Sequence, residues 1–555
     1  MHARFHVTVK IKYKNMKKYF NKLSAALTPV ALLATVSCTD LDETIYSELS
    51  KDNFYNSKVE IMQGVLRPFT HMQAWLAPTG QSGYYYHGES AADQIAWPQK
   101  GRHGYDGGDH VRLHRHEWTP QENRLRGSWG LMWEGLGYVN ALLEDFEDVD
   151  FEAAGLTQVE KESIIAEVKV MRAFHYMKIM DMWGNVPIVT SVGQPTNPET
   201  RPSAEVFQFV EEELLANVEK LQPLSQALVG RVSKAAGYAM LSELYLNAEV
   251  WSGTPRYDEC ITYSDKVING EGGSLMGNMR LDPSILGPFS NQNQFSPENI
   301  FQFAFSRDGG FTFNWSGFFF GYSNMSRALD VTYSGWNAFV VIPTAFDAFE
   351  ENDMRKQEWF LFGPQTDYDT GEPILGTEEW ADQPLVYVNN IRRNSEGATG
   401  EGSMTEGEEN SGARFNKYRS GTSDEEGTYW ENDYVIYRLT EIYFNKAEAL
   451  MRKNGGAPTA EALELVNESR KRSFDEADWA TEAYTASTLT MDELLAERGR
   501  EFIFEGKRRT DLIRFGEFTS GNWWDKDASE PTRTLFPIPH IHLSLNPNLT
   551  QNPGY

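Results

Sequence analysis

The strongest constraint on the fold is one long stretch of helical periodicity, ESIIAEVKVMRAFHYMKIMDMW, at residues 162–183. Its apolar residues recur at spacings of four and three, which places them on one face of an α-helix. Gly184 and Pro187 follow, and both residue types end helices. The pattern therefore predicts a helix of about 22 residues that packs one apolar face against neighbouring helices.

Further helical segments follow this one and carry recognisable start and stop signals. Ser203 and Ser233 are expected to act as N-caps of two helices, because their hydroxyl groups accept hydrogen bonds from free backbone N–H groups. Gly270 is expected to close another helix. The remaining predicted helices cover residues 233–251, 256–270, 438–453, 459–472 and 490–507.

Adjacent helices with short connections favour helical hairpins stacked side by side. A length of about 35–40 residues per pair is compatible with a tetratricopeptide-like solenoid. The sequence therefore predicts an all-α fold of tetratricopeptide-like helical pairs. Its helical frame is expected at about 51–270 and 435–520.

The middle of the chain, about 271–435, has a different composition. It is rich in Gly, Asn, Ser, Phe and acidic residues, as in FTFNWSGFFFGY and NSEGATGEGSMTEGEENSG. Such composition indicates a loop-rich insertion with a few short strands. Residues 536–555 hold four prolines, so no regular helix is expected there.

The formal net charge of −28 is unevenly distributed. Residues 1–37 hold seven Lys or Arg residues and no acid, and an apolar run from Leu23 to Val36 follows the basic part. That layout is typical of a signal peptide. We expect a signal peptide at 1–37, with 1–15 a superfluous extension before Met16. The acidic body of the protein argues against nucleic acid as a partner.

Cys38 stands where a bacterial lipoprotein signal places its lipidated cysteine, although Thr35 replaces the Leu that is usual three residues earlier. The chain has two cysteines, so lipidation of Cys38 would leave Cys260 alone and exclude an intramolecular disulfide. We expect a lipidated acidic linker at 38–50 and a single domain at 51–555. No later stretch is apolar enough to span a bilayer, so anchoring through lipid is predicted.

Three glutamates, Glu497, Glu501 and Glu505, fall every four residues and are predicted to share one helix face. Carboxylates on successive turns lie about 5–6 Å apart, close to the separation in a retaining glycosidase. However, Arg498 and Arg500 are interleaved with them, which favours structural ion pairs. Catalysis is therefore not expected, and a glycoside hydrolase stays the alternative.

Histidines and known motifs give no stronger sign of chemistry. No regular element aligns His110, His114 and His116 for a metal, and His175 lies on the apolar face of 162–183, as a core histidine would. Motifs for serine hydrolases, zinc proteases, phosphate-binding loops and EF-hands are absent from the sequence. Neither a metal nor another cofactor is predicted.

Aromatic residues gather in two Gly-, Pro- and Asp-rich stretches. One is APTGQSGYYYHGESAADQIAWPQKGRHGYDGGDH, and the other runs from Trp315 to Trp336 and includes Tyr322. Exposed aromatic rings suit the C–H faces of sugars, whereas half or more of these rings are expected in the core. The candidate ligand-binding residues are Trp75, Trp97, His103, Tyr105, Asp106, Trp315 and Trp336.

Several stretches together resemble the SusD/RagB family of outer-membrane nutrient-binding lipoproteins. They include MRAFHYMKIMDMWGNVPIV, GRVSKAAGYAMLSELYLNAEVW, ERGREFIFEGKRRTDLIRFG and FPIPHIHLSLNPNLTQNPGY, in family order. The resemblance implies a non-catalytic, lipid-anchored protein of the outer-membrane surface. It would bind oligosaccharide and deliver it to a SusC-like TonB-dependent transporter.

The resemblance leaves the ligand and its contacts open. Some members of the family bind peptides, so a peptide ligand is an alternative to a glycan. A scaffold for envelope assembly without a small ligand is a further alternative. In the family the N-terminal loop often holds a Trp where His103-Gly104-Tyr105 stands in this chain, so this stacking position is open.

Overall fold

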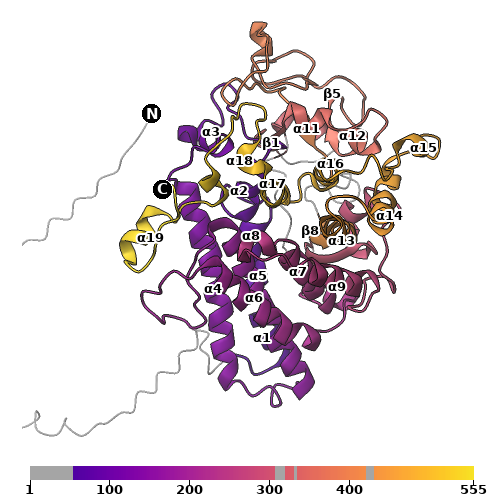
Figure 1. Cartoon of the computed structure of the whole chain (residues 1–555). Helices are drawn as coiled ribbons and strands as arrows, with labels where there is room; N and C mark the ends of the chain where they lie inside the picture. Colours follow the sequence, from indigo (N-terminus) through magenta and orange to yellow (C-terminus); the bar gives the residue numbers. More distant parts are fainter. Residues whose placement is uncertain (1–53, 307–318, 320, 330–333, 420–430) are drawn as a thin grey trace, which may run out of the picture. The chain divides into compact units, whose positions relative to one another are not determined.

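The computed structural model describes residues 54–306, 319, 321–329, 334–419 and 431–555 (Figure 1). The predicted signal peptide, the linker at 38–50 with its lipidation site Cys38, and Trp315 lie outside the described residues. The described part is mostly helical with a few short strands, which confirms the predicted fold class.

The helices of the first half are α1 (Lys58–Leu76), α2 (Tyr84–Ser90), α3 (Asp109–His114), α4 (Asn123–Asp148), α5 (Gln158–Trp183), α6 (Ser203–Asn217), α7 (Lys234–Leu246), α8 (Ala248–Ser252) and α9 (Tyr257–Ile268). Those of the second half are α11 (Pro343–Asp347), α12 (Met354–Glu358), α13 (Leu439–Lys453), α14 (Ala460–Arg470), α15 (Trp479–Glu482), α16 (Met491–Phe502), α17 (Arg508–Phe515), α18 (Glu517–Ser520) and α19 (His540–Leu545). The strands are β1 (Ile95–Ala96), β2 (Asn299–Phe303), β3 (Val340–Val341), β4 (Phe360–Leu361), β5 (Gly363–Pro364), β6 (Val386–Tyr387), β7 (Arg414–Phe415) and β8 (Tyr434–Arg438).

The long helix α5 begins and ends as its sequence dictates. The Thr157 hydroxyl accepts a hydrogen bond from the Glu160 N–H, and the Glu160 carboxylate accepts one from the Thr157 N–H, which forms a capping box. Gly184 ends the helix with a φ of 65°. The prediction of a single apolar face is wrong: every residue from Val170 to Trp183 is buried, because α5 packs against both α4 and α6 and against the core.

The other helices follow their predicted ranges with local differences. Ser233 caps α7 through its hydroxyl, as expected. Ser203 is instead the first residue of α6, and its hydroxyl donates to the Trp251 carbonyl. The predicted helix 233–251 is divided at Asn247 into α7 and α8. The helices α7, α9, α13 and α14 pack in succession, as stacked helical pairs do.

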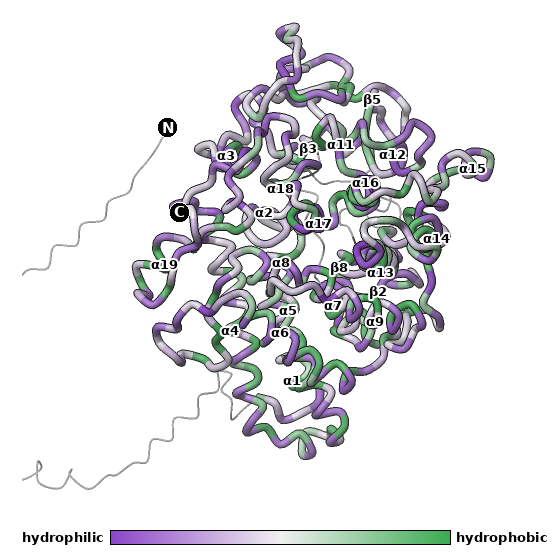
Figure 2. Tube along the Cα trace, in the orientation of Figure 1, coloured by the Kyte–Doolittle hydropathy of each residue, from purple (hydrophilic) through white to green (hydrophobic). Residues whose placement is uncertain are grey.

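Strands occur as two-stranded antiparallel pairs within the described residues: β1 with β3, β2 with β8, β4 with β7 and β5 with β6. The pair β2–β8 joins the start of the middle region to its end, immediately before α13. In Figure 2, hydrophobic and hydrophilic segments alternate along α1 and α4. No described helix combines the length and the apolar character that a membrane span requires.

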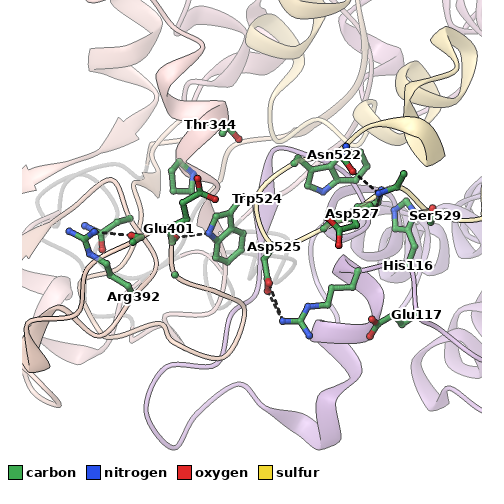
Figure 3. Close-up of a pocket in the computed structure, with 18 of the residues that line it drawn as sticks. His116, Glu117, Thr344, Arg392, Glu401, Asn522, Trp524, Asp525, Asp527 and Ser529 are labelled. Carbon is green, nitrogen blue, oxygen red and sulfur yellow. Dashed lines mark hydrogen bonds and ion pairs between the residues drawn. The ribbon is translucent and has the colours of Figure 1, made fainter.

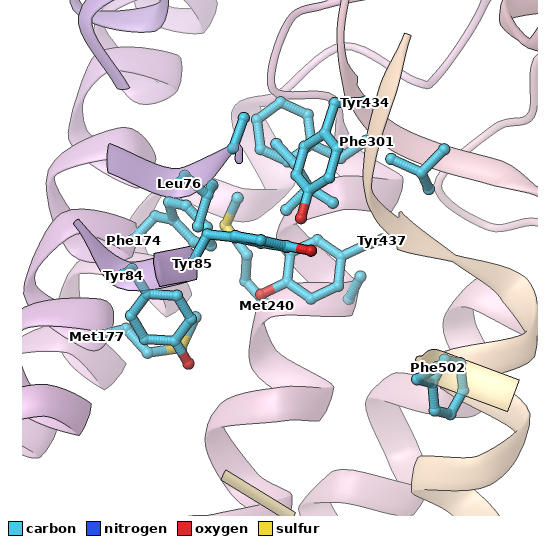
Figure 4. Packing of buried hydrophobic residues seen from close by; sticks show 14 of the residues in the cluster. Leu76, Tyr84, Tyr85, Phe174, Met177, Met240, Phe301, Tyr434, Tyr437 and Phe502 are labelled. Carbon is cyan, nitrogen blue, oxygen red and sulfur yellow. The ribbon is translucent and has the colours of Figure 1, made fainter. Parts of the chain in front are cut away.

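One part of the extended core lies where α2, α5 and α7 meet the strands β2 and β8 (Figure 4). Phe174 of α5 contacts Phe301 of β2 and Tyr437 of β8 edge-on, with ring centroids 6.2 Å apart in both cases. Tyr85 of α2 meets Tyr434 at 6.1 Å. Perpendicular ring contacts of this kind stabilise aromatic cores beyond the area that they bury.

Two predictions for the C-terminal part need correction. The helix α16 ends at Phe502, five residues earlier than predicted, because Phe504 takes a left-handed conformation with a φ of 70°. Glu505 is therefore not on the same helix as Glu497 and Glu501. Between the prolines of the last 20 residues, α19 forms one short helix of six residues.

Candidate functional site

The short pair β1–β3 brings the two aromatic stretches of the sequence together. Ala96 is opposite Val340 in this antiparallel pair. The residues that precede β3, among them Trp336, therefore lie beside those that follow β1. This pairing places the turn around His103 next to Trp336, although 233 positions separate them in the sequence.

Trp97 forms the floor of this region and does not offer a ring face to a ligand. Its side chain is 5% exposed and stacks on His110, with ring centroids 4.1 Å apart and planes 15° apart. Phe339 meets it from another side at 5.1 Å. The structure therefore shows the Trp97 ring packed among protein side chains, and its contact with ligand stays a prediction.

Trp75 is wrongly predicted as a ligand residue. It lies in the last turn of α1 with no exposed surface and packs against Phe174 and His175. A side chain so completely enclosed contributes to the core of the helical part. The His175 imidazole, which donates to the Met171 carbonyl at 2.9 Å, is the core histidine that the sequence predicted.

A buried lysine holds the turn at residues 100–103 against the segment that follows Trp336. The Lys100 ammonium donates hydrogen bonds to the carbonyls of Asn337 and Ala338, the latter at 2.7 Å. Burial, reinforced by the Arg414 guanidinium, holds the pKa of Lys100 well below its usual value. Gly104 has a φ of 76°, and a Cβ there would lie 3.1 Å from Nε1 of Trp97. Glycine therefore lets the chain turn back closely over that indole.

Trp336 is the strongest candidate for ligand contact among the described residues, because its side chain is 55% exposed on a backbone held at both ends. On one side the Gly335 N–H donates to the Gly321 carbonyl at 2.9 Å. On the other side Asn337 accepts from Arg414 at 2.8 Å and donates to the Glu409 carbonyl at 3.0 Å. A large ring displayed on a fixed loop is typical of a binding surface.

Hydrogen bonds from Gly335 to Gly321 and from Lys100 to Asn337 bring the neighbouring segments to the backbone on either side of Trp336. Five residues of these segments and of the loop that holds Glu378 are called the aromatic face: Arg102, His103, Tyr322, Trp336 and Glu378. The rings of His103 and Tyr322 have centroids 5.9 Å apart. Glu378 holds the Arg102 guanidinium at 3.3 Å and lies 3.6 Å from Nε2 of His103. Burial and the Glu378 carboxylate raise the pKa of Tyr322 to about 12, so its hydroxyl keeps its proton. The face combines ring surfaces with donors and acceptors.

The two remaining candidates lie at the edge of this face. Tyr105 is 50% exposed and follows the close turn at Gly104. Asp106 is bound by the Arg124 guanidinium at 2.7 Å and lies 3.3 Å from the His110 imidazole. Asp106 therefore holds the loop together, whereas Tyr105 keeps its side chain available.

Sequence reasoning missed the polar members of the face. Tyr322 was part of the predicted aromatic cluster and was not chosen as a ligand residue. Arg102 and Glu378 carry no local signal, because their contact joins segments 276 residues apart. The pairing of the two loops could be found only from the three-dimensional fold.

The three glutamates considered for catalysis belong to a buried ion network. Glu497 and Glu501 both bind the Arg355 guanidinium at 2.9 Å, and Glu505 binds Arg438 at 2.8 Å. Glu497 also binds Arg470 at 2.6 Å. Each carboxylate is almost entirely enclosed, so no substrate reaches it.

The pKa of Glu497 shows how these cations act. Burial alone would raise that pKa, but Arg355, Arg500 and Arg470 together lower it well below its usual value. A general acid requires the opposite shift. The geometry therefore agrees with the structural interpretation of these glutamates and gives a glycosidase no pair of accessible carboxylates at this place.

The histidines near α3 bind three separate protein groups. His110 shares a hydrogen bond of 2.7 Å with the Tyr86 hydroxyl, and His114 one of 2.7 Å with the Trp524 carbonyl. His116 bonds to the Ala91 carbonyl at 2.8 Å. Across the part of the chain that the structure describes, no three His, Cys, Asp or Glu side chains gather as metal ligands would.

Family models match most of the chain. A model described as "SusD family" matches residues 297–555, and one described as "Starch-binding associating with outer membrane" matches residues 41–246. The two matches divide the chain near the boundary between the N-terminal helices and the middle region.

Individual relatives are similar to this chain over most of its length, and solved structures among them share its fold. The chain is 28% identical to the starch-binding protein SusD of Bacteroides thetaiotaomicron over 511 residues, which cover 86% of each protein. Among solved structures, a laminarin-binding SusD-like protein has a TM-score of 0.67 at 20% identity and covers 90% of this chain and 100% of its own. The surface glycan-binding protein A of Bacteroides thetaiotaomicron with laminarihexaose also has a TM-score of 0.67, at 18% identity, and covers 89% and 99%. The chain belongs to the SusD/RagB family.

Proposed function

We propose that this chain is a non-catalytic surface lipoprotein that binds oligosaccharide on the aromatic face. The observation that carries the proposal is Trp336, a half-exposed indole whose chain neighbours Gly335 and Asn337 are both hydrogen-bonded, Gly335 through its backbone and Asn337 through its side chain. An exposed aromatic ring that lies among other ring surfaces is a common feature of ligand-binding surfaces. The face offers it one rigid orientation, which lowers the entropy lost on binding.

The composition of the face suits a neutral sugar chain. The indole of Trp336 can pack on the C–H face of a pyranose ring, and Tyr322 and His103 offer further ring surface. Arg102 donates hydrogen bonds and Glu378 accepts them, so hydroxyl groups find both kinds of partner. The names of the relatives, which include starch, laminarin and glycan binding, support a saccharide ligand.

The remaining parts of the proposal concern location and partner. Lipidation of Cys38 would tether the domain at 51–555 to the outer membrane, and delivery would proceed to a SusC-like TonB-dependent transporter. The description of the family model that matches residues 41–246 supports association with the outer membrane. Mass spectrometry of the mature N-terminus tests the anchor, and co-purification of a barrel protein from membranes tests the partner.

Isothermal titration against a glycan panel that includes laminarihexaose and soluble starch tests the binding itself. We expect Trp336→Ala to weaken binding of the best glycan at least about tenfold, equivalent to about 1.4 kcal/mol. Phe295→Ala is the matched control, because Phe295 is also half exposed but lies outside the face. Equal loss in both variants would refute the assignment of the face.

The same protein preparation separates the alternatives. Binding of peptides without binding of any glycan would move the chain to a peptide ligand. Release of reducing ends from the polysaccharides would identify a hydrolase, and the non-catalytic assignment would then be wrong. Loss of membrane association in Cys38→Ala would support the lipid anchor.

A further inference from the structure

A large polar cleft lies apart from the aromatic face (Figure 3). Its volume is about 1370 Å³, above the roughly 300–1,000 Å³ of pockets for small ligands. Four segments distant in sequence form its walls: 115–117 after α3, 343–344 at the start of α11, 389–402 of the middle region, and 522–533 after α18. Three of them, 115–117, 389–402 and 522–533, supply most of the lining. A cleft of this size suits several units of a chain molecule better than a single small compound.

Hydrogen bonds fix the walls in place. The Arg115 guanidinium binds both carboxylate oxygens of Asp525, at 3.0 and 2.9 Å, and Asp525 also accepts from the Met404 N–H at 2.7 Å. The indole N–H of Trp524 donates to the Glu401 carbonyl at 2.9 Å. His116 bonds to the Ser529 hydroxyl at 2.9 Å. The three segments are therefore tied to one another before any ligand arrives, which favours binding.

The charges of the cleft disfavour an anionic ligand. The cations of the lining already bind protein oxygens: Arg115 binds Asp525, Arg392 the Gly400 carbonyl at 2.9 Å, and Arg533 the Trp118 carbonyl at 2.8 Å. Lys526 donates to two carbonyls. Among the described residues, the carboxylates of four lining residues have no ion-pair partner: Glu117, Glu401, Asp527 and Glu530. Hydroxyl groups, which can donate to carboxylates, suit this lining.

Two lining residues carry a buried polar atom without a hydrogen-bond partner in the described part of the chain. They are the indole Nε1 of Trp523, which is a donor, and the amide Oδ1 of Asn389, which is an acceptor. Buried polar groups nearly always have a hydrogen-bond partner, so each exception needs an explanation. Both atoms are enclosed by protein, so they are polar groups within the wall of the cleft and do not by themselves identify a ligand.

From these features we infer that the cleft is a second saccharide site, which takes a neutral, hydroxyl-rich stretch of the same polysaccharide. The inference rests on the proposed function. A metal ion fits less well, since no three ligating side chains gather among the described residues. The cleft shares no lining residue with the aromatic face, but hydrogen bonds connect the two regions. The Met404 N–H donates to Asp525 of the cleft, and the Met404 carbonyl accepts from the Gln99 N–H at 2.7 Å, just before the turn that carries Arg102 and His103. Two sites on one chain would raise the affinity for polymer above that for short oligosaccharides.

Hydrogen exchange with laminarihexaose and with soluble starch tests the inference on the full chain. We expect peptides from 389–402 and 522–530 to become protected when glycan is added, in wild type and in Trp336→Ala alike. Ala528→Trp fills the cleft from an exposed lining position and should abolish that protection while the aromatic face stays protected. Ala477→Trp, at an exposed alanine outside the cleft, is the matched control and should behave as wild type.

Each other outcome decides against the inference in its own way. Protection confined to the aromatic face, or cleft protection that disappears in Trp336→Ala, would overturn the second site and leave the proposed function intact. Protection nowhere in wild type would refute both. Protection of the cleft by a hexalysine peptide but not by glycan would overturn the ligand class. Should Ala528→Trp fail to fold, Thr344→Trp blocks the same cleft from the start of α11.

Discussion

The buried ion network around Arg438 and the aromatic face around Trp336 both contain arginine and glutamate side chains, but these side chains have different roles in the two regions. In the network, Arg438 binds Glu298, Glu501 and Glu505, each at 2.8 Å, and water is excluded. On the face, Arg102 meets one carboxylate, Glu378, at 3.3 Å and remains largely exposed. Charges that are fully paired hold elements together, whereas charges with free hydrogen-bonding capacity can take a ligand.

The largest expected effect comes from breaking the network. Arg438→Met leaves three buried carboxylates without their shared cation and should lower the free energy of unfolding by about 3–5 kcal/mol. Denaturation in guanidinium chloride measures it. Arg102→Met on the aromatic face is the control and should change stability by no more than about 0.5 kcal/mol. Similar losses in the two variants would remove the distinction between the regions.

Two tryptophans make the next comparison. Trp75→Ala should lower the free energy of unfolding by about 3–5 kcal/mol, because a fully buried ring leaves a cavity. Trp336→Ala should change stability by less than about 1 kcal/mol, since its ring is already half in water. Titration calorimetry should show the reverse order for glycan affinity: Trp336→Ala should lose affinity, and Trp75→Ala should keep it under conditions in which this variant is folded. A loss of affinity in folded Trp75→Ala would contradict the assignment of this residue to the core.

The sequence predicted the periodic elements, but it could not show which of these two tryptophans is buried and which is exposed. The helix α5 was predicted because its period, its Gly184 stop and its length agree. Trp75 and Trp336 both lie near Gly- and Pro-rich stretches, and only the position of Trp75 in the last turn of α1 decides its burial. The end of α16 was missed because the left-handed backbone at Phe504 is imposed by packing and is unusual for an aromatic residue.

The aromatic face shows the same limit of prediction from sequence, here for residues that are far apart along the chain. His103 and Trp336 were both predicted as candidates from local composition. The proximity of the two loops that carry them depends on the pairing of β1 with β3. Each of these strands has two residues and is too short to leave a pattern in the sequence. Glu378 was missed for the same reason, because a glutamate in a loop carries no signal of the residue that it binds.

Acid should weaken the buried ion network. Burial alone would raise the pKa of Glu298, but Arg472 and Arg438 lower it to about 2. A carboxyl with a lowered folded pKa contributes stability above its ordinary value of 4.5, and that contribution is lost as the pH falls toward 2. Unfolding midpoints measured from pH 5 to pH 2 should therefore fall. The slope should be shallower in Glu298→Gln, and an unchanged slope would contradict the role of this carboxylate.

The smallest expected effect concerns the ion pair on the aromatic face. Exposed pairs contribute only about 0.2–1 kcal/mol to stability, so Glu378→Gln should leave the unfolding midpoint nearly unchanged. Glycan affinity should still fall about two- to fivefold, because the variant releases Arg102 and His103 from one orientation and weakens an acceptor for sugar hydroxyls, at about 0.5–1 kcal/mol per hydrogen bond. Since the ligand is neutral, raising the salt concentration should weaken wild-type binding no more than the variant does. A steep salt dependence in wild type alone would instead indicate a charged ligand on this face.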